Sequence, residues 1–403
     1  TAATRENADR TVLGFWTSSL GRIFTDDFES GSLLHIKNGK YHVQNDSTIL
    51  SGIFTSAMGS YYFNGFFFNN KFEARLTNRK KEIKGIIQGT SNAPKTPLND
   101  YSIIYKEAIT LTSSKIFDSS ILRSKEWKKF DKKMKDVSSK VQDDLELVFA
   151  FFYYSNKLPF SHFSLMKIEN EESNNIEIYE PQVILEEKNS STAYMRILSF
   201  SGSVKEMDSI MTTIKSKKYQ NLIVDLRNNP GGSIAAGLTF ATNIVDTAFF
   251  GGIFLTQKYF NENKNIPLVE EYNQFPLFSE ANFDLIIEGI HNERGLYLQV
   301  IPQKEVYEGN VFILTNNNTA STCEPIVYGF KQFNQATIVG EKTAGAMLNG
   351  EIFELNYGFS LVIPTATYYT SDGFKIDNNG VEPNIKTESK NALNYVLENL
   401  IEK

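Results

Sequence analysis

Hydrophobic and polar positions change their spacing twice along the chain. Over residues 14–104, short segments rich in β-branched and aromatic residues alternate with Asn-rich turns, as in YYFNGFFF at 61–68. This pattern is typical of antiparallel strands and predicts a β-rich, barrel-like N-terminal module. Over residues 119–152 the apolar residues recur near helical spacing among many Lys and Asp residues. We therefore predict a helical region there, which Pro159 ends.

From residue 193 onward, strand and helix patterns alternate. The predicted strands are 194–200, 222–226, 311–315 and 337–340, and the predicted helices are 205–216, 233–245 and 322–333. Between the second helix and the third strand we expect a long polar excursion. The alternation predicts a mostly parallel sheet covered by helices.

The chain of 403 residues is longer than most single hydrophobic cores, so it favours a multidomain α/β protein. We expect an N-terminal β-rich module over 1–104, a short helical region over 105–160 and an α/β core over 161–403. The polar, Pro-containing segment 92–100 is interpreted as a linker.

Composition and charge exclude several functions. The 41 Lys and Arg residues against 47 Asp and Glu give a formal charge of −6, and the basic residues are scattered apart from runs at 79–81 and 128–135. We therefore expect no nucleic-acid partner. The longest apolar stretch, 147–154, is far shorter than a bilayer-spanning helix, so we expect no transmembrane segment. A single cysteine, Cys323, excludes an intramolecular disulfide.

The chain opens with Thr1-Ala2-Ala3 and has no initiator Met. We interpret this as the removal of a leader or signal peptide and expect a secreted or periplasmic protein, with surface anchoring through such a leader as the alternative.

Two segments place small residues between a predicted strand and a predicted helix: DLRNNPGG at 225–232 and TASTCE at 319–324. The hydroxyl of Ser321 is a candidate nucleophile at such a junction, and the N–H of Thr322 is a candidate oxyanion donor. The competing interpretation is a capping box, in which Ser321 and Glu324 only begin the helix. The glycine pair by itself indicates only a tight turn.

The two segments, in this order, resemble the DLRxNxGG and TASxxE motifs of the C-terminal processing peptidase and tricorn protease superfamily of serine peptidases. The resemblance covers residues 119–386 and implies a ClpP/crotonase-like α/β core in which Ser321 is the nucleophile. It also implies that Thr322 and either Gly231 or Gly232 supply the oxyanion donors. Many members carry a peptide-binding PDZ domain where this chain has only residues 163–192, so we expect that domain to be absent.

The general base separates two branches of the superfamily. Processing peptidases use a lysine, and by its spacing from the serine the corresponding residue here is Ala346. Lys342 stands four residues earlier, and we interpret it as solvated or ion-paired. Tricorn-like members use a histidine preceded by a serine, which among the four histidines matches Ser161-His162. With a pKa near neutrality, His162 is suited to take the proton of Ser321.

The third member is a carboxylate. Tricorn-like chains have an acid in x-Glu-x-x-Gly-Val-x-Pro, and the matching segment 376–383 places Asp377 at that position. Glu382 in the same segment is the alternative triad acid, and an Asp that only opens an Asn-rich turn is the structural alternative. We interpret Cys323 as a small buried hydrophobe. No His, Cys or acidic cluster has metal-ligand spacing, so no metal or cofactor is expected.

The resemblance thus implies a serine endopeptidase that acts on peptides or proteins through an acyl-enzyme on Ser321, with His162 as base, Asp377 as its orienting acid and Ser161 in the same site. The alternative is a catalytically decayed peptidase core that binds peptides, apolar ligands or glycans.

Overall fold

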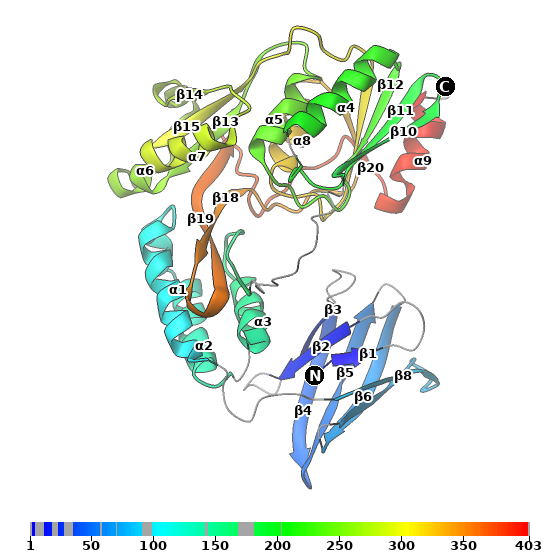
Figure 1. Cartoon of the computed structure of the whole chain (residues 1–403), viewed down its shortest axis with the longest axis vertical. Coiled ribbons are helices and arrows are strands. Elements are labelled where there is room, and N and C mark those ends of the chain that lie inside the picture. The colour runs from blue at the N-terminus through cyan, green and yellow to red at the C-terminus, as the bar shows by residue number, and fades with distance from the viewer. Residues whose placement is uncertain are drawn as a thin grey trace, which may run out of the picture.

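The computed structural model describes residues 2–4, 12–17, 23–27, 35–56, 59–69, 71–90, 99–141, 144–167, 181–202 and 204–401. These residues form three β-sheets, with helices over the later two (Figure 1). Most of the predicted linker and part of the segment that would hold a PDZ domain, 168–180, lie outside the described residues. Both expectations therefore stay predictions.

The first sheet is antiparallel and has the strand order β3-β2-β1-β8-β7-β6-β5-β4. Its strands are β1 (Ala2–Thr4), β2 (Val12–Thr17), β3 (Ile23–Asp27), β4 (His35–Gln44), β5 (Ser47–Ser56), β6 (Gly59–Phe68), β7 (Lys71–Thr77) and β8 (Ile83–Thr90). Phe63 on β6 is buried whereas its neighbour Tyr62 is exposed, as strand geometry requires. The predicted β-rich N-terminal module is confirmed.

The second sheet is parallel except for its first strand and has the order β10-β11-β12-β16-β17-β20. Its strands are β10 (Val183–Asn189), β11 (Thr192–Ile197), β12 (Asn221–Asp225), β16 (Asn310–Thr315), β17 (Thr337–Gly340) and β20 (Ile385–Lys386). The helices that alternate with them are α4 (Val204–Lys217), α5 (Ile234–Thr242), α8 (Cys323–Gln332) and α9 (Ala392–Val396). The predicted mostly parallel α/β core is confirmed.

The third sheet corrects the expectation of a polar excursion. It is built from β14 (Leu277–Phe278), β15 (Gly295–Val300), β13 (Phe249–Thr256), β19 (Phe359–Thr370) and β18 (Leu348–Glu354), and β9 (Ser164–Lys167) pairs with β19. Residues 246–310 supply β13, α6 (Gln257–Glu262), β14, α7 (Phe283–Asn292) and β15. The polar residues of this segment lie around α6 and α7, while its strands are largely buried.

The helical region begins earlier than predicted, at α1 (Tyr101–Lys115), where the side chain of Asp100 accepts the first free N–H groups. A 3₁₀ turn (Ser119–Arg123), α2 (Lys125–Ser138) and α3 (Asp144–Ser155) follow. These helices share one hydrophobic cluster with β9, β18 and β19. Figure 1 shows them beside the long β18–β19 hairpin. The helical region therefore has no core separate from the third sheet, and the three-domain division stays a prediction.

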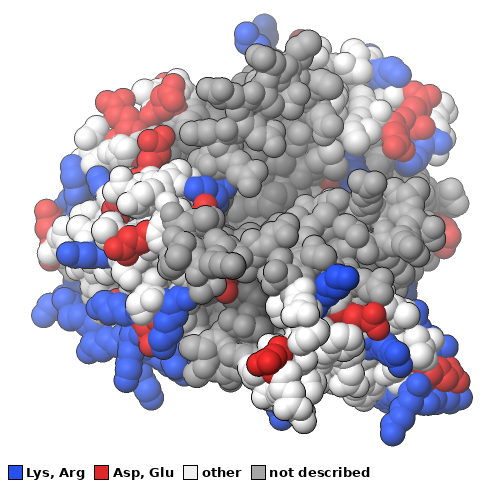
Figure 2. Space-filling view, turned by 60° about the horizontal axis from the view of Figure 1, so that its bottom comes forward, with Lys and Arg blue, Asp and Glu red and all other residues white. Residues whose placement is uncertain are grey.

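Charged side chains of both signs are interspersed on the described part of the face in Figure 2. The basic run on α2 is partly neutralised within the same region, because Lys135 and Lys140 pair with Asp131 and Asp136. In the part of the chain that the structure describes, every helix is too short or too polar to cross a bilayer.

Candidate active site

Ser321 lies in the turn between β16 and α8, in a left-handed backbone conformation with φ of 54°. Its N–H donates to the carbonyl of Ala346 at 3.0 Å and to Oε2 of Glu324 at 3.2 Å. Its Oγ lies 3.3 Å from Nε2 of His162. The Glu324 half of the capping box is therefore present, but the Ser321 hydroxyl faces an imidazole. A non-glycine residue is strained at positive φ, so contacts with the surrounding structure must stabilise this backbone conformation.

His162 also has a left-handed backbone, with φ of 55°, in the segment between α3 and β9. The next residue, Phe163, anchors it, because its ring packs against Trp127, Phe130 and Phe151 at centroid distances of 5.6, 5.7 and 5.0 Å. The helical region thus fixes the segment that carries the imidazole. A side chain from that region meets one from the parallel sheet, although 159 residues separate them.

Ser161 links His162 to a carboxylate. Its Oγ donates to Oδ1 of Asp377 at 2.6 Å and lies 2.8 Å from Nδ1 of His162. A serine hydroxyl has one proton, and here Asp377 accepts it, so Oγ can only accept at His162. The proton of the neutral imidazole is thereby placed on Nδ1, which leaves the lone pair of Nε2 directed at Ser321.

Asp377 is buried in the connection between β19 and β20. Besides Ser161, it accepts from the N–H of Met347 at 3.2 Å and from Nδ2 of Asn378 at 3.1 Å. Its hydrogen bonds reach His162 through Ser161, whereas the sequence suggested direct orientation. Glu382, the alternative acid, pairs at the surface with Lys386 and Lys342 at 2.9 and 3.4 Å. Lys342 is ion-paired there.

The four side chains Asp377, Ser161, His162 and Ser321 form a relay of hydrogen bonds, and burial shifts the pKa values of its two titratable groups. It lowers the pKa of His162 from its ordinary value of 6.5 to about 4, so the pKa near neutrality that we expected from sequence is shifted downward. Burial also raises the pKa of Asp377, and the Ser161 hydroxyl opposes this rise. At neutral pH the imidazole is therefore uncharged, so its Nε2 keeps a lone pair that can accept a hydrogen bond from Ser321.

Two backbone N–H groups beside Ser321 have no acceptor among the described residues: those of Thr322 and Gly232. The N–H of Gly231 differs, because it donates to Oδ1 of Asn229 at 2.8 Å. A Cβ on Gly231 would lie 2.5 Å from Cβ of Ser321, so the glycine turn and Ser321 are in direct contact. The hydroxyl of Thr322 donates to the carbonyl of Gly232 at 2.7 Å and joins the two turns.

Two small residues lie next to Ser321 and His162. Ala346, at the position of the superfamily's lysine, contacts the Ser321 turn through its backbone. A Cβ on Gly350 in β18 would lie 3.0 Å from Cδ2 of His162 and 3.2 Å from its Cβ. A side chain at position 350 would therefore crowd the ring that Gly350 now accommodates.

Other candidate groups are placed outside the relay. Cys323 is fully buried, burial raises the pKa of its thiol, and its Sγ lies 3.7 Å from the carbonyl of Asn229. His42 lies on β4, and His291 on α7 pairs with Glu351 at 2.6 Å. Within the described residues, no group of three His, Cys, Asp or Glu side chains is arranged to hold a metal ion.

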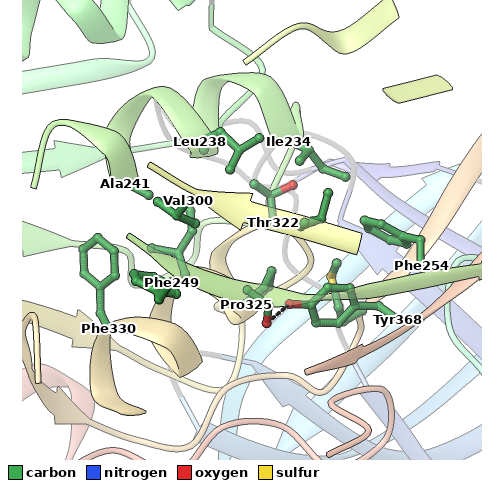
Figure 3. A pocket seen from close by; sticks show the side chains of 15 residues that line it. Ile234, Leu238, Ala241, Phe249, Phe254, Val300, Thr322, Pro325, Phe330 and Tyr368 are labelled. Carbon is green, nitrogen blue, oxygen red and sulfur yellow. Dashed lines mark hydrogen bonds between the residues drawn. The ribbon is translucent and has the colours of Figure 1, made fainter. Parts of the chain in front are cut away.

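An apolar pocket opens next to the turn that holds Ser321 and Thr322, between α5 and α8 (Figure 3). Thr322 lines it together with aliphatic and aromatic side chains that include Leu238, Ile326, Phe249 and Phe330. Tyr368 also lines it, but its hydroxyl is satisfied by the carbonyl of Gly251 at 2.8 Å. The pocket therefore presents a mainly apolar surface.

Sequence reasoning missed two residues of this site. Gly350 has no local signal, because its contact with His162 arises only when β18 and the segment before β9 come together. Asn229 was quoted within the first motif without a role, yet its backbone carbonyl accepts from Ala320 and its amide donates to Ile197. An Asn within a glycine turn, in a motif paired with that of the candidate nucleophile, was the available signal.

Residues 191–387 match the profile of Peptidase family S41. Carboxyl-terminal-processing protease of Synechocystis is 28% identical over 200 residues, covering 48% of this chain and 37% of that protein. Carboxy-terminal processing protease CtpA of Bacillus subtilis is 23% identical over 207 residues, covering 51% and 37%. The chain thus spans well under half the length of these relatives.

Among solved structures, a lipoprotein from Streptococcus agalactiae aligns with a TM-score of 0.49 at 15% identity, covering 76% of this chain and 98% of that one. Residues 191–387, just under half of the chain, thus match peptidase family S41, and the related sequences over this region are those of carboxyl-terminal processing proteases.

Proposed function

We propose that this chain is a serine endopeptidase whose nucleophile is Ser321 and whose general base is His162. The observation that carries the proposal is the continuous chain of contacts from Asp377 through Ser161 and His162 to Ser321, at 2.6, 2.8 and 3.3 Å. Three hydrogen bonds in series, which join four side chains, match the arrangement of an activated serine, in which an acid fixes the tautomer of the base.

In the proposed reaction, Oγ of Ser321 attacks the peptide carbonyl while its proton passes to Nε2 of His162. The imidazolium that forms is stabilised by Asp377 through the Ser161 hydroxyl. It then returns the proton to the leaving amine, which leaves an acyl group on Ser321. Water hydrolyses this ester by the same base catalysis. A separation of 3.3 Å without substrate is compatible with this role, because catalytic hydrogen bonds shorten when substrate binds.

The oxyanion is assigned to the N–H groups of Thr322 and Gly232, since both belong to the two turns that meet at Ser321 and neither has an acceptor among the described residues. The N–H of Gly231 is committed to Asn229. Preorganised backbone donors of this kind stabilise the charge that develops on the carbonyl oxygen.

The apolar pocket beside Thr322 supports a substrate preference. We assign it to the side chain that precedes the scissile bond, because Thr322 both lines the pocket and supplies an oxyanion donor. Burying an unpaired charge there costs several kcal/mol. Peptides with an apolar residue before the cleavage site should exceed matched peptides with Lys or Asp by at least about tenfold in kcat/KM.

Labelling with a fluorophosphonate tests the proposed function. The wild-type chain should be labelled on Ser321, and Ser321→Ala should lose both the label and peptide hydrolysis, by ~10⁴-fold or more in kcat. Lys342→Ala is the matched control, because Lys342 contributes only a surface ion pair, and it should keep most of the activity. Equal labelling of wild type and Ser321→Ala would remove Ser321 from the mechanism. An unlabelled wild-type chain would favour the alternative of a decayed core that only binds ligands.

A further inference from the structure

Glu324 is a fully buried carboxylate that the proposed reaction does not use. It lies in the first turn of α8 and has no ion-pair partner in the described part of the chain. Oε1 accepts from Oγ1 of Thr343 at 2.6 Å and from the N–H of Gly345 at 2.7 Å. Oε2 accepts from the N–H of Ala346 at 2.7 Å and from that of Ser321 at 3.2 Å. One carboxylate therefore joins the nucleophile turn to three residues of a single loop.

All four partners of Glu324 are donors. Three are backbone N–H groups, which cannot accept. The Thr343 hydroxyl itself accepts from the N–H of Val381 at 2.7 Å, so its proton is committed to Glu324. Burial raises the pKa of Glu324, and these four donors oppose the rise. An amide in its place would direct an NH₂ group at donors that have no lone pair to offer.

The same loop, residues 343–347, also holds the acid end of the relay. The carbonyl of Gly345 accepts from Asn378 at 2.7 Å, and Thr343 exchanges backbone and side-chain bonds with Val381. The N–H of Met347 donates to Oδ1 of Asp377 at 3.2 Å. The loop is thus bonded on one side to Ser321, through Glu324, and on the other to Asp377.

We propose that Glu324 is a positioning residue that holds the Ser321 turn and the Asp377 connection at a fixed separation through the loop 343–347. This inference rests on the proposed function. Glu324 does not touch the reacting atoms. It sets the strained backbone of Ser321 and the place of Asp377, so its loss should misalign the relay while substrate binding in the apolar pocket is kept.

The test compares Glu324→Gln and Thr343→Val with Thr343→Ser in the full chain. Glu324→Gln should lower kcat and the rate of fluorophosphonate labelling by about 10- to 100-fold with KM changed less than about threefold, because it removes a charged acceptor of several hydrogen bonds. Thr343→Val should lower both rates by about fivefold, and Thr343→Ser, which keeps the hydroxyl, should stay within about twofold. Circular dichroism should match wild type in all three variants.

A purely structural role would give a different pattern, in which losses of kcat follow losses of circular dichroism or of thermal midpoint. Wild-type kcat and labelling in folded Glu324→Gln would overturn the proposal. If Glu324→Gln does not fold, Thr343→Val decides: a wild-type labelling rate there overturns the proposal as well. Failure of the wild-type chain itself to label would instead contradict the proposed function, so the two failures are distinguishable.

Discussion

Ser161 is the residue through which Asp377 reaches His162, and Ser161→Ala therefore cuts the relay without removing the nucleophile, the base or the acid. The change deletes the acceptor at 2.8 Å from Nδ1 and the donor at 2.6 Å from Asp377. The partner charge on Asp377 stays, with bonds to Met347 and Asn378. A small residue replaces a partly buried hydroxyl, so the fold should be kept.

The expected loss of kcat depends on whether the Ser161 hydroxyl stabilises the neutral or the protonated imidazole of His162. A hydrogen bond to a charged group contributes about 1.5 to 3 kcal/mol, and this bond is charged when His162 becomes an imidazolium. With about 1.4 kcal/mol for each factor of ten, Ser161→Ala should lower kcat by roughly 10- to 150-fold. KM should change little, because the neutral imidazole needs the bond less.

A double-mutant cycle with Asp377→Asn provides the decisive measurement. Asp377→Asn alone should lower kcat by ~10²- to 10⁴-fold, as loss of a triad carboxylate does elsewhere. Because Asp377 acts through Ser161, the kcat of the double variant should lie within about fivefold of the kcat of the less active single variant. Steady-state peptide hydrolysis and the rate of fluorophosphonate labelling should agree.

Two results would refute this reasoning. If folded Ser161→Ala keeps kcat within about threefold of wild type, the hydroxyl does not transmit the effect of Asp377. If the two changes multiply in the cycle, the residues act independently, and Asp377 stabilises His162 by another route.

Further predictions concern the base, its neighbours and the chain boundary. The proposed mechanism requires neutral His162, whose pKa is lowered to about 4, so kcat/KM should stay high down to a lower pH than for an ordinary histidine and fall only as pH approaches about 4. A fall in kcat/KM that already begins above pH 6.5 would contradict the assigned burial. Gly350→Ala should displace the imidazole and lower kcat by about tenfold or more, and full activity would show that the ring has room. Glu382→Gln should keep kcat within about tenfold of wild type, since Glu382 forms only exposed ion pairs; a much larger loss of kcat would indicate that Glu382 is the triad acid. A chain that begins at Asn99 should fold and cleave small peptides, because Asn99 bonds to α3 and the cap of α1 is kept, and an insoluble product would show that the first sheet shares the core.

The parallel part of the fold could be predicted because its signals are local. Buried strands such as β12 and β16 are continuous apolar runs that end in small residues, and helices with regular spacing follow them. The junctions that carry Ser321 and the glycine pair fall at these ends, so their proximity follows from parallel pairing of neighbouring strands.

The third sheet and the surroundings of His162 could not be predicted in the same way. Strand β13 pairs with β15 and with β19 across long stretches of sequence, as β9 does with β19, and the register of these pairs depends on tertiary packing. Helix α1 begins at Tyr101, where the side chain of Asp100 caps its first turn. This start lies within the predicted β-rich module, 1–104, whose aromatic and β-branched residues suggested strands. The route from Asp377 to His162 by way of Ser161 needs the positions of three side chains, which spacing cannot supply.

The proposed nucleophile and the proposed base belong to different sheets. Ser321 and the glycine turn follow the carboxyl ends of β16 and β12, two central strands of the parallel sheet, while His162 lies between α3 and β9, a strand of the third sheet. The catalytic rate should therefore depend on the relative position of these two sheets, because it requires the 3.3 Å contact between Oγ of Ser321 and Nε2 of His162. On gradual heating, catalytic activity should disappear before the helical circular dichroism signal does, because a slight parting of the layers breaks the relay while each layer stays folded. Coincident loss of both signals would mean that the two layers melt as one cooperative unit.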